Sequence, residues 1–358
     1  MNWSVAHDYW YYTAGAERVA RHLCDAAGTN RLLVLAGNGD LVRGESLDCT
    51  RLLPRPLSGE ATQHLFAPIV PALSKLAKPI EGGDVLFSSY SFVHHWPSTG
   101  KRIVYCHSPV RQLWVDPELY MNGWPRWKQI GLRSLGPTLR SWDAKAARRN
   151  NGYIATSRAV ASRISSSYGI EAMAIIAPPV ASSFVPAWRS RGDNYLFVGR
   201  IVEPVKRLEP LIEAFRAMPR EVLHIAGEGP PDRDRLESIA PTNVKFLGWK
   251  SQKEVVRLLQ ECKALICPSE EDFGLASAEA ISCATPVLAL NRSGARDVLI
   301  DGMTGCMFDE PSPAAIRQAV RRFSGSLFYP DEIVEHAKQF SELNFKRNVK
   351  SLLESVGG

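Results

Sequence analysis

The sequence predicts an α/β fold with two similar domains, each built on a parallel sheet. Short apolar runs alternate with stretches of helical period along the whole chain, and this is the pattern of strands and helices in such sheets. The chain has 358 residues, more than the roughly 250 to 300 at which a single core stops growing. Two prolines at 178 and 179 indicate a linker. We therefore expect one domain at 1–181, a second at 182–340 and a last helix at 341–358.

The composition is that of an ordinary soluble globular protein. Hydrophobic residues make up 45% of the chain and charged residues 22%, and the formal net charge is +6. No apolar run approaches the ~18 residues needed to span a bilayer. The N-terminus lacks the basic and apolar regions of a signal peptide, and the positive charge has no nucleic-acid motif behind it. We expect a cytoplasmic protein without a nucleic-acid partner.

Carboxylates, glycine and a helix start converge within residues 264–290. The apolar run 264–267 reads as a buried parallel strand, 268–272 as the loop at its carboxyl end, and a helix begins near Gly274. Glu271 then lies in the loop, and Glu279 lies more than one turn inside the helix. Eight helical residues would separate the two by about 12 Å, so both can hold one ligand.

Backbone groups add to this predicted site. The free N–H groups of Phe273, Gly274 and Leu275 would face the same crevice, and a helix start of this kind suits phosphate or sugar oxygens. The alternative is ordinary α/β construction, because acidic residues near a helix start favour the helix dipole in any protein.

The whole pattern resembles a known signature. Glu-x7-Glu enclosing Phe-Gly-Leu, followed by Pro286-Val287 and Ser293-Gly294-Ala295, is similar to the donor-sugar signature of the retaining glycosyltransferases of family GT4. The resemblance implies the GT-B fold, two Rossmann-like domains facing across a cleft, with the last helix packing back on the first domain. It also implies that Glu271 binds the hydroxyls of the transferred sugar and that Glu279 binds the ribose of the nucleotide.

Two basic residues lie where they could neutralise the negative charge of a phosphate group. Arg200 follows a predicted strand and Lys206 precedes a predicted helix, and a planar guanidinium with an ammonium can neutralise a diphosphate. The spacing resembles the Gly-Arg…Lys pair of GT4 enzymes, although isolated basic loop residues are usually solvated. In family members the loop that holds Trp249 lies against the nucleobase.

The first domain supplies further candidates. Gly15 lies in a run that resembles the glycine-rich first loop of GT4 enzymes, with Ala14 where a second glycine is common. His107 ends an apolar strand at 102–106, and the resemblance makes its imidazole a contact of the transferred sugar; a core histidine is the alternative. We interpret His94 and His95 as loop residues near the acceptor side, not as metal ligands.

The resemblance implies a retaining hexosyltransferase with no cofactor. We expect His107, Glu271, Arg200 and Lys206 to be catalytic, with the two cations in place of a metal ion. The chain shows no obvious enzymic nucleophile, which favours a same-face mechanism over a covalent double displacement. A nucleotide-sugar 2-epimerase of the same fold and a non-catalytic sugar-nucleotide-binding subunit are the alternatives.

Two further expectations concern the substrates. The run from His107 to Trp114, including Ser108, Pro109 and Arg111, is similar to bacterial polysaccharide mannosyltransferases, so we expect GDP-mannose as donor and a glycan or polyprenyl-linked acceptor. Residues 124–149 carry three tryptophans and seven basic residues, as a helix in an anionic membrane interface would. We expect attachment to the inner face of the cell membrane, with a plain protein core as the alternative.

Overall fold

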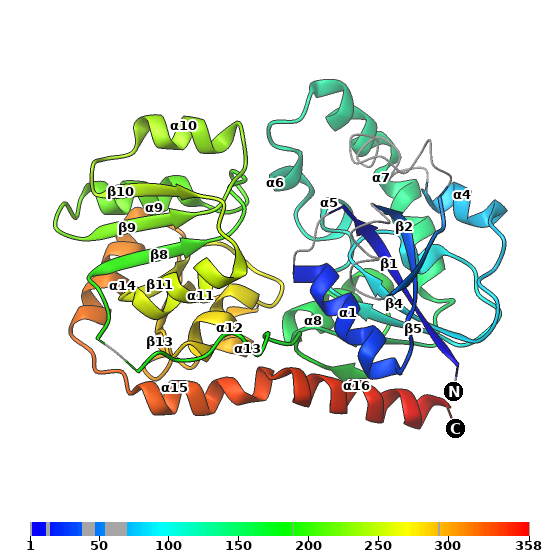
Figure 1. The fold of residues 1–358 in the computed structure, drawn as a ribbon. Coiled ribbons are helices and arrows are strands. Elements are labelled where there is room, and N and C mark those ends of the chain that lie inside the picture. Colours follow the sequence, from blue (N-terminus) through cyan, green and yellow to red (C-terminus); the bar gives the residue numbers. More distant parts are fainter. Residues whose placement is uncertain are drawn as a thin grey trace. The chain divides into compact units, whose positions relative to one another are not determined.

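The computed structural model describes residues 2–11, 15–37, 47–53, 70–188, 190–292 and 294–357. The chain forms two compact units (Figure 1). Unit 1 comprises Met1–Pro179 with Leu343–Gly358, and unit 2 comprises Val180–Glu342. The first break thus lies two residues before the boundary that the sequence predicts. None of the described helices combines the length and hydropathy that a bilayer crossing requires.

Unit 1 contains a parallel seven-stranded sheet with the order β3-β2-β1-β4-β5-β6-β7. The direction of strand addition reverses between β1 and β4, and open α/β sheets bind ligands at the carboxyl edge of such a reversal. The strands are β1 (Trp3–Trp10), β2 (Arg31–Gly37), β3 (Asp48–Arg51), β4 (Asp84–Ser89), β5 (Arg102–Cys106), β6 (Gly152–Ala155) and β7 (Ala174–Ile175).

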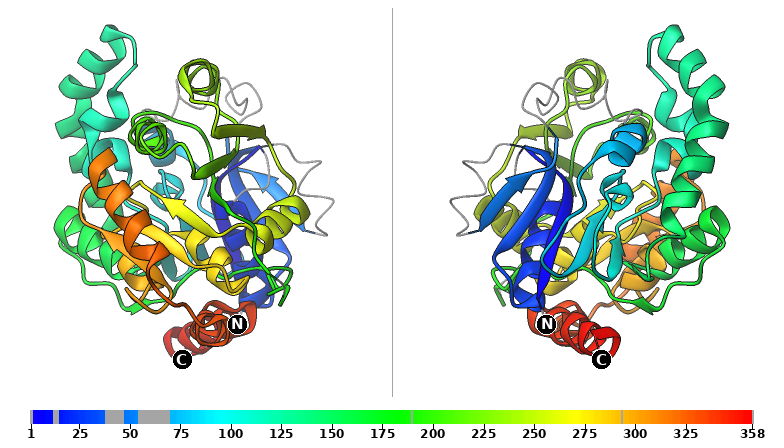
Figure 2. Two further views of the ribbon diagram at one scale, coloured as in Figure 1. Left: turned by 90° about the vertical axis from the view of Figure 1, so that its left-hand side faces the viewer. Right: turned by 90° about the vertical axis from the view of Figure 1, so that its right-hand side faces the viewer.

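Helices cover both faces of this sheet (Figure 1). They are α1 (Gly15–Ala27), α4 (Val70–Leu76), the short 3₁₀ turn η3 (Val93–His95), α5 (Arg111–Trp114), α6 (Pro117–Met121), α7 (Arg126–Ala147), α8 (Arg158–Tyr168) and α16 (Glu342–Gly357). The last helix, α16, lies beside α1 (Figure 2), and its Phe345, Val349 and Leu353 belong to the same buried cluster as Val19 and Leu23. The C-terminal segment therefore contributes to the core of unit 1.

Unit 2 contains a parallel six-stranded sheet with the order β10-β9-β8-β11-β12-β13. Its reversal lies between β8 and β11. The strands are β8 (Asn194–Val198), β9 (Val222–Ala226), β10 (Val244–Gly248), β11 (Ala264–Cys267), β12 (Val287–Leu290) and β13 (Gly305–Phe308); the helices are α9 (Leu208–Arg216), α10 (Asp232–Ile239), α11 (Gln252–Glu261), α12 (Leu275–Ser282), α13 (Ala295–Val298), α14 (Pro313–Ser324), α15 (Pro330–Ala337) and η4 (Lys338–Phe340).

Most predicted elements agree with the structure, and β1 is longer than predicted. The strands at 84–89, 102–106 and 264–267 have the expected bounds. The sequence places the end of the first strand at Asp8, but pairing continues to Tyr9 and Trp10, which lie opposite Ala36 and Gly37. Both aromatic side chains are buried. The strand therefore extends two residues further at the carboxyl edge of the sheet.

Candidate functional site

The reversal in the sheet of unit 2 brings two predicted site residues into contact. Lys206, in the loop after β8, lies with its Nζ 2.7 Å from Oε1 of Glu271, in the loop after β11. Ser269 donates a hydrogen bond of 2.6 Å to the same carboxylate oxygen. The side chains of Lys206 and Glu271 remain 23% and 29% exposed. A ligand at this edge can therefore reach an ammonium and a carboxylate side by side.

The loop that carries Lys206 is fixed from within. Glu203 Oε1 accepts a hydrogen bond of 2.7 Å from the Leu208 amide and so satisfies one of the free N–H groups at the start of α9. The Glu203 amide in turn donates to Asp232 Oδ2 at 2.9 Å. Burial raises the pKa of Glu203, and the Leu208 amide opposes this shift. These contacts hold Lys206 in place without engaging its ammonium.

The start of α12 depends on two glycines. Gly274, the residue before the helix, has a φ of 93°, a backbone conformation that costs other residues energy. Gly294 donates its amide to the carbonyl oxygen of Glu271 at 2.9 Å. A Cβ on Gly294 would lie 2.3 Å from the Phe273 backbone, so only glycine fits there. The loop thereby presents the first N–H groups of Leu275 and its successors at the carboxyl edge of the sheet.

The other predicted residues of unit 2 follow neighbouring strands. Glu279 lies in the second turn of α12 and is 6% exposed. Arg200 follows β8 and is exposed. Trp249 follows β10 and is 70% exposed, and its amide donates to Glu228 Oε1 at 3.0 Å. Since all these strands are parallel, the side chains belong to one edge of the sheet, where Lys206 and Glu271 touch.

The expectation that the chain has no Asp-x-Asp pair is wrong, because Asp232-Arg233-Asp234 is one. Asp232 and Asp234 occupy the first turn of α10. Such a spacing lets two carboxylates share a cation, but Asp232 already accepts the Glu203 amide, and acids in the first turn of a helix favour its dipole. We interpret this pair as part of the loop architecture.

In unit 1, His107 belongs to a chain of three hydrogen-bonded side chains, His7, Ser88 and His107. His107 Nε2 lies 2.9 Å from Ser88 Oγ, and His7 Nδ1 lies 3.0 Å from that hydroxyl and 3.1 Å from the Ser88 carbonyl oxygen. Because a carbonyl oxygen only accepts, His7 Nδ1 carries the hydrogen in this pair. The Ser88 hydroxyl can donate to His107 Nε2 or accept from it.

Burial keeps both imidazoles neutral. It lowers the pKa of His107 to about 4. It lowers the pKa of His7 to about 3, with a further contribution from His107. Next to His7, the buried Asp8 carboxylate accepts the amides of Tyr90, Ser91 and Val93 at 2.7 to 2.8 Å and so fixes the loop after β4. Sequence analysis named neither Ser88 nor the role of Asp8, because both depend on the pairing of β1 with β4.

Gly15 is the first residue of α1. The structure thus places it at the start of a helix that follows the carboxyl end of β1. The neighbouring Thr13 and Ala14 of the predicted glycine-rich loop lie outside the described residues, as does Ser293 in unit 2.

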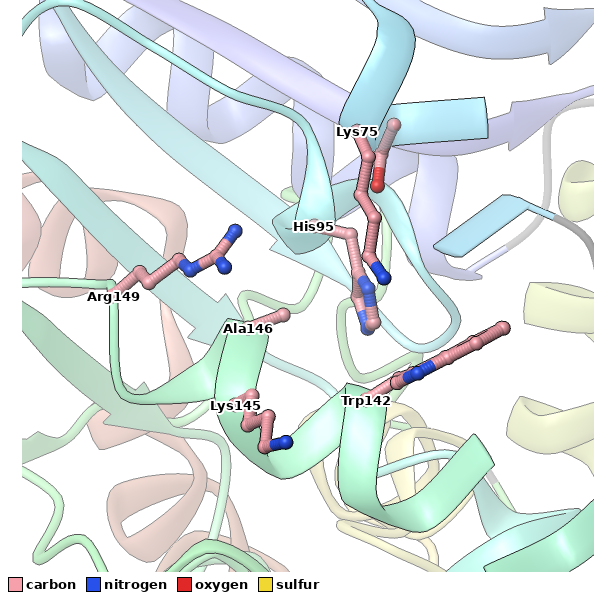
Figure 3. Close-up of a pocket in the computed structure, with 7 residues that line it drawn as sticks. Lys75, His95, Trp142, Lys145, Ala146 and Arg149 are labelled. Atoms are coloured by element: carbon pink, nitrogen blue, oxygen red, sulfur yellow. The ribbon is translucent and has the colours of Figure 1, made fainter. Parts of the chain in front are cut away.

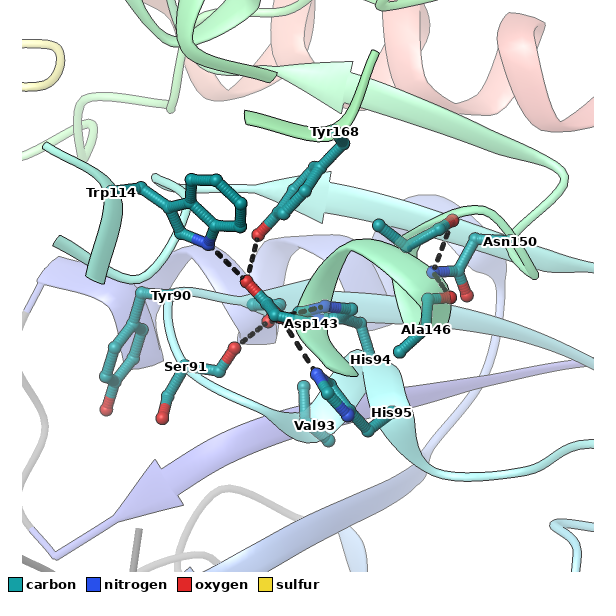
Figure 4. A network of polar contacts seen from close by, with 12 residues as sticks. Tyr90, Ser91, Val93, His94, His95, Trp114, Asp143, Ala146, Asn150 and Tyr168 are labelled. Atoms are coloured by element: carbon teal, nitrogen blue, oxygen red, sulfur yellow. Dashed lines mark hydrogen bonds and ion pairs between the residues drawn. The ribbon is translucent and has the colours of Figure 1, made fainter. Parts of the chain in front are cut away.

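His94 and His95, which the sequence places in a loop, lie in a short 3₁₀ turn after β4. Both are buried in η3 and approach Oδ1 of Asp143 at 3.1 and 2.8 Å (Figure 4). Oδ2 of Asp143 accepts hydrogen bonds from Trp114 Nε1 at 2.6 Å and from the Tyr168 hydroxyl at 3.0 Å. Burial raises the pKa of the Asp143 carboxyl, but the two imidazoles outweigh it and hold the pKa below its usual range.

Groups of this type can hold a metal ion, since the candidate atoms of His94, His95 and Asp143 lie within 4.8 Å of one another. Here the carboxylate already accepts hydrogen bonds from His95, Trp114 and Tyr168, and His94 Nε2 lies 3.1 Å from Oδ1. We interpret the cluster as a buried polar network that connects α7 to η3 and α8. Trp114, one of the residues behind the mannose expectation, belongs to this network.

Residues 192–325 match the family model Glycosyl transferases group 1. The matched segment includes Arg200, Lys206, Glu271 and Glu279.

Individual relatives show the same relationship over part of the chain. An uncharacterized glycosyltransferase of Methanocaldococcus jannaschii is 28% identical over 152 residues, which cover 41% of this chain and 42% of the relative. A D-inositol 3-phosphate glycosyltransferase of Mycolicibacterium gilvum is 30% identical over 177 residues, covering 45% of this chain and 38% of the relative. The chain thus matches less than half the length of these curated relatives.

Structural similarity extends further than sequence similarity. The crystal structure of Anabaena HepE in complex with UDP-glucose has a TM-score of 0.68 at 15% identity and covers 98% of this chain and 99% of HepE. The predicted fold class, α/β with two Rossmann-like domains of the GT-B type, is confirmed.

Proposed function

We propose that this protein is a glycosyltransferase that moves a hexose from a nucleotide-sugar donor to an acceptor hydroxyl. The contact of Lys206 with Glu271 carries the proposal. The bond that breaks in this reaction joins the sugar to the diphosphate, so one group must hold phosphate and its neighbour must hold sugar hydroxyls. The two side chains lie 2.7 Å apart at the reversal of the unit 2 sheet, where α/β sheets bind nucleotides.

The charges of this edge suit a diphosphate leaving group. Arg200 and Lys206 carry two positive charges, and Glu271 carries one negative charge. Negative charge grows on the leaving phosphate in the transition state, where preorganised cations and helix N–H groups act most strongly. Two cations and the start of α12 can do this without a metal ion. The family match of residues 192–325 supports the same assignment.

Retention at the anomeric carbon is part of the proposal. Glu271 binds Lys206 and Ser269, which suits a carboxylate that holds sugar hydroxyls more than one that attacks carbon. A same-face reaction follows, in which the leaving phosphate oxygen takes the acceptor proton. His107, whose buried imidazole is neutral near pH 7 because burial lowers its pKa to about 4, is assigned a hydrogen bond to the transferred sugar.

Release of nucleoside diphosphate from nucleotide-sugar donors tests this function. The wild type should release the diphosphate slowly alone and faster with a glycan or polyprenyl-linked acceptor. Glu271→Gln should abolish release, while Glu310→Gln, an exposed carboxylate on the same unit, should leave it unchanged. Equal release by Glu271→Gln and the wild type would remove the proposed site. If the product were a free epimerised nucleotide sugar, the protein would be an isomerase and not a transferase.

For the donor we propose GDP-mannose. The support is the resemblance of the run from His107 to Trp114 to polysaccharide mannosyltransferases. HepE was solved with UDP-glucose, which makes a uridine nucleotide the competing donor, and the exposed Trp249 ring can stack on either base. A thermal-shift panel of GDP, UDP and dTDP decides between them: stabilisation by GDP alone supports the proposal, and stabilisation by UDP or dTDP without GDP refutes it.

We also propose that unit 1 docks on an anionic membrane through α7. Trp127, Ile130 and Leu135 on this helix are 64%, 61% and 54% exposed, whereas Leu139 is buried and Trp142 packs partly on the core. An exposed apolar strip with basic neighbours is typical of interfacial helices. Bacterial polysaccharide units on polyprenyl lipids would then be reached from the cytoplasmic face.

Vesicle flotation tests the docking. The wild type should float with anionic vesicles at low salt, and Trp127→Ser/Ile130→Ser should not. Leu327→Ser is the matched control, because Leu327 is 80% exposed on unit 2. Failure of the wild type to float with either anionic or neutral vesicles would contradict membrane docking and leave the donor site unaffected.

A further inference from the structure

A small hollow in unit 1 is lined by cations from two helices. It has a volume of about 270 Å³ and lies between the end of α4, η3 and the end of α7 (Figure 3). This is just below the range of about 300 to 1,000 Å³ that is common for small-molecule sites. Its lining consists of Ser74, Lys75, His95, Trp142, Lys145, Ala146 and Arg149.

The charged side chains that line this hollow are cations. Lys75, Lys145 and Arg149 contribute three positive charges, and none of the lining residues that the structure describes is acidic. The nearby carboxylate of Asp143 is buried behind His95, whose Nε2 contacts it at 2.8 Å, and it accepts further hydrogen bonds from Trp114 and Tyr168. The Asp143 carboxylate is therefore bound by these partners and not by the cations that line the hollow.

Packing and geometry bring these cations together. Lys75 Nζ lies 4.7 Å from the centre of the Trp142 ring, a cation–π contact that holds the ammonium beside the hollow. Lysines in the last turn of a helix are favoured by the helix dipole, which accounts in part for Lys75 and Lys145. The helix dipole does not explain why Lys75, Lys145 and Arg149, which follows α7, all line the same hollow. Because like charges repel, an anion in the hollow would stabilise the three cations that line it.

We propose that this hollow binds a phosphate group. The side chains supply what a phosphate needs, a guanidinium for paired oxygens and two ammonium groups as point charges. The phosphate can belong to a lipid headgroup or to a soluble phosphorylated compound, since the recognised chemistry is the same. The proposal is independent of the proposed transferase activity, because none of these residues belongs to the unit 2 site.

Isothermal titration calorimetry with inorganic pyrophosphate tests the proposal on the full chain. The background is Arg200→Ala/Lys206→Ala, in which the proposed diphosphate site of unit 2 has lost its cations. The pocket variant adds Lys145→Gln/Arg149→Gln. The control adds Lys253→Gln/Arg257→Gln, which removes the same charge from a shallow hollow on α11 where Glu254 and Glu261 also lie.

The pocket variant should bind pyrophosphate at least about tenfold more weakly than the control. Equal affinity in the two variants overturns the proposal. Lys75→Gln, a single exposed substitution on α4, should also weaken binding, which keeps the test decisive if the double variant is poorly folded. Loss of binding on going from the wild type to the background reports on unit 2 alone, so the two sites are judged separately.

Flotation with phosphatidic acid and with phosphatidylcholine vesicles identifies the source of the phosphate. If a lipid supplies it, the pocket variant should float less with phosphatidic acid vesicles than the control, although the exposed apolar residues of α7 are the same in both. If a soluble compound supplies it, both should float alike while calorimetry still separates them. Either result supports a phosphate site. If the pocket variant and the control behave alike in both calorimetry and flotation, the hollow is not a phosphate site.

Discussion

At the residue scale, Lys206 differs from a surface lysine because its partner is a candidate ligand of the sugar. Its contact with Glu271 at 2.7 Å places it where phosphate charge would develop. Lys206→Ala should therefore lower kcat more than it raises the KM for donor, by roughly ten- to a hundredfold. Steady-state kinetics with Lys350→Ala as the control, an exposed lysine on α16, measures this split. An unchanged kcat for Lys206→Ala would exclude it from the chemistry.

Asp143 illustrates a structural role at the same scale. Its carboxylate is fully buried, accepts hydrogen bonds from His95, Trp114 and Tyr168, and lies 3.1 Å from His94 Nε2. Asp143→Asn replaces one acceptor oxygen by a donor, which should destabilise unit 1 by about 3 kcal/mol or more. Thermal unfolding compares it with Asp25→Asn, where a half-exposed carboxylate lies 3.6 Å from Arg21 and little stability is at stake. Similar midpoints for both variants would contradict this role.

At the element scale, α12 joins a glycine-dependent start to a buried carboxylate in its second turn. Glu279→Ala should remove hydrogen bonds to the ribose and weaken nucleotide binding about ten- to a hundredfold while the fold persists. Calorimetry with the preferred nucleoside diphosphate measures the loss. Glu332→Ala on α15, an exposed carboxylate, should bind like the wild type. Wild-type affinity in Glu279→Ala would remove this residue from the site.

The strands and turn that carry buried histidines should make unit 1 sensitive to acid. Burial lowers the pKa of His107 to about 4, of His7 to about 3 and of His95 to about 4, from 6.5. Below pH 6.5 the unfolded chain binds protons that the folded chain refuses, so stability falls as the pH drops toward 4. Each histidine adds about 1.4 kcal/mol per pH unit to this slope. The raised pKa of Asp8 acts in the opposite direction and offsets only part of it.

Urea unfolding at about pH 7 and about pH 5 measures this slope. The wild type should be clearly less stable at the lower pH, and His7→Gln should show a smaller difference between the two conditions. Equal stability at both values would show that the histidines titrate normally.

At the scale of the whole molecule, the sequence predicted what depends on local pattern. The strands at 84–89 and 102–106 are apolar runs with polar flanks, and α12 begins after a glycine whose φ few other residues adopt. Long-range contacts could not be predicted in this way. Lys206 and Glu271 are 65 positions apart, and His95 and Asp143 are 48 apart. Such pairs follow from strand order and helix packing, which hydrophobic period does not encode.

The same limit explains the errors. The sequence shows no third ligand beside His94 and His95, which favours loop residues, whereas their buried partner Asp143 lies on α7, 48 positions after His95. The residues 124–149 gave an ambiguous pattern because one helix, α7, presents Trp127 to solvent and packs Leu139 on the core.

A crystal structure of the protein with its preferred nucleoside diphosphate tests the central claim most directly. The diphosphate should lie at the carboxyl ends of β8 and β11, within hydrogen-bond distance of Arg200, Lys206 and the first amides of α12, with the ribose against Glu279. A nucleotide bound elsewhere, with the Lys206–Glu271 pair of unit 2 untouched, would contradict the assignment of this edge as the donor site.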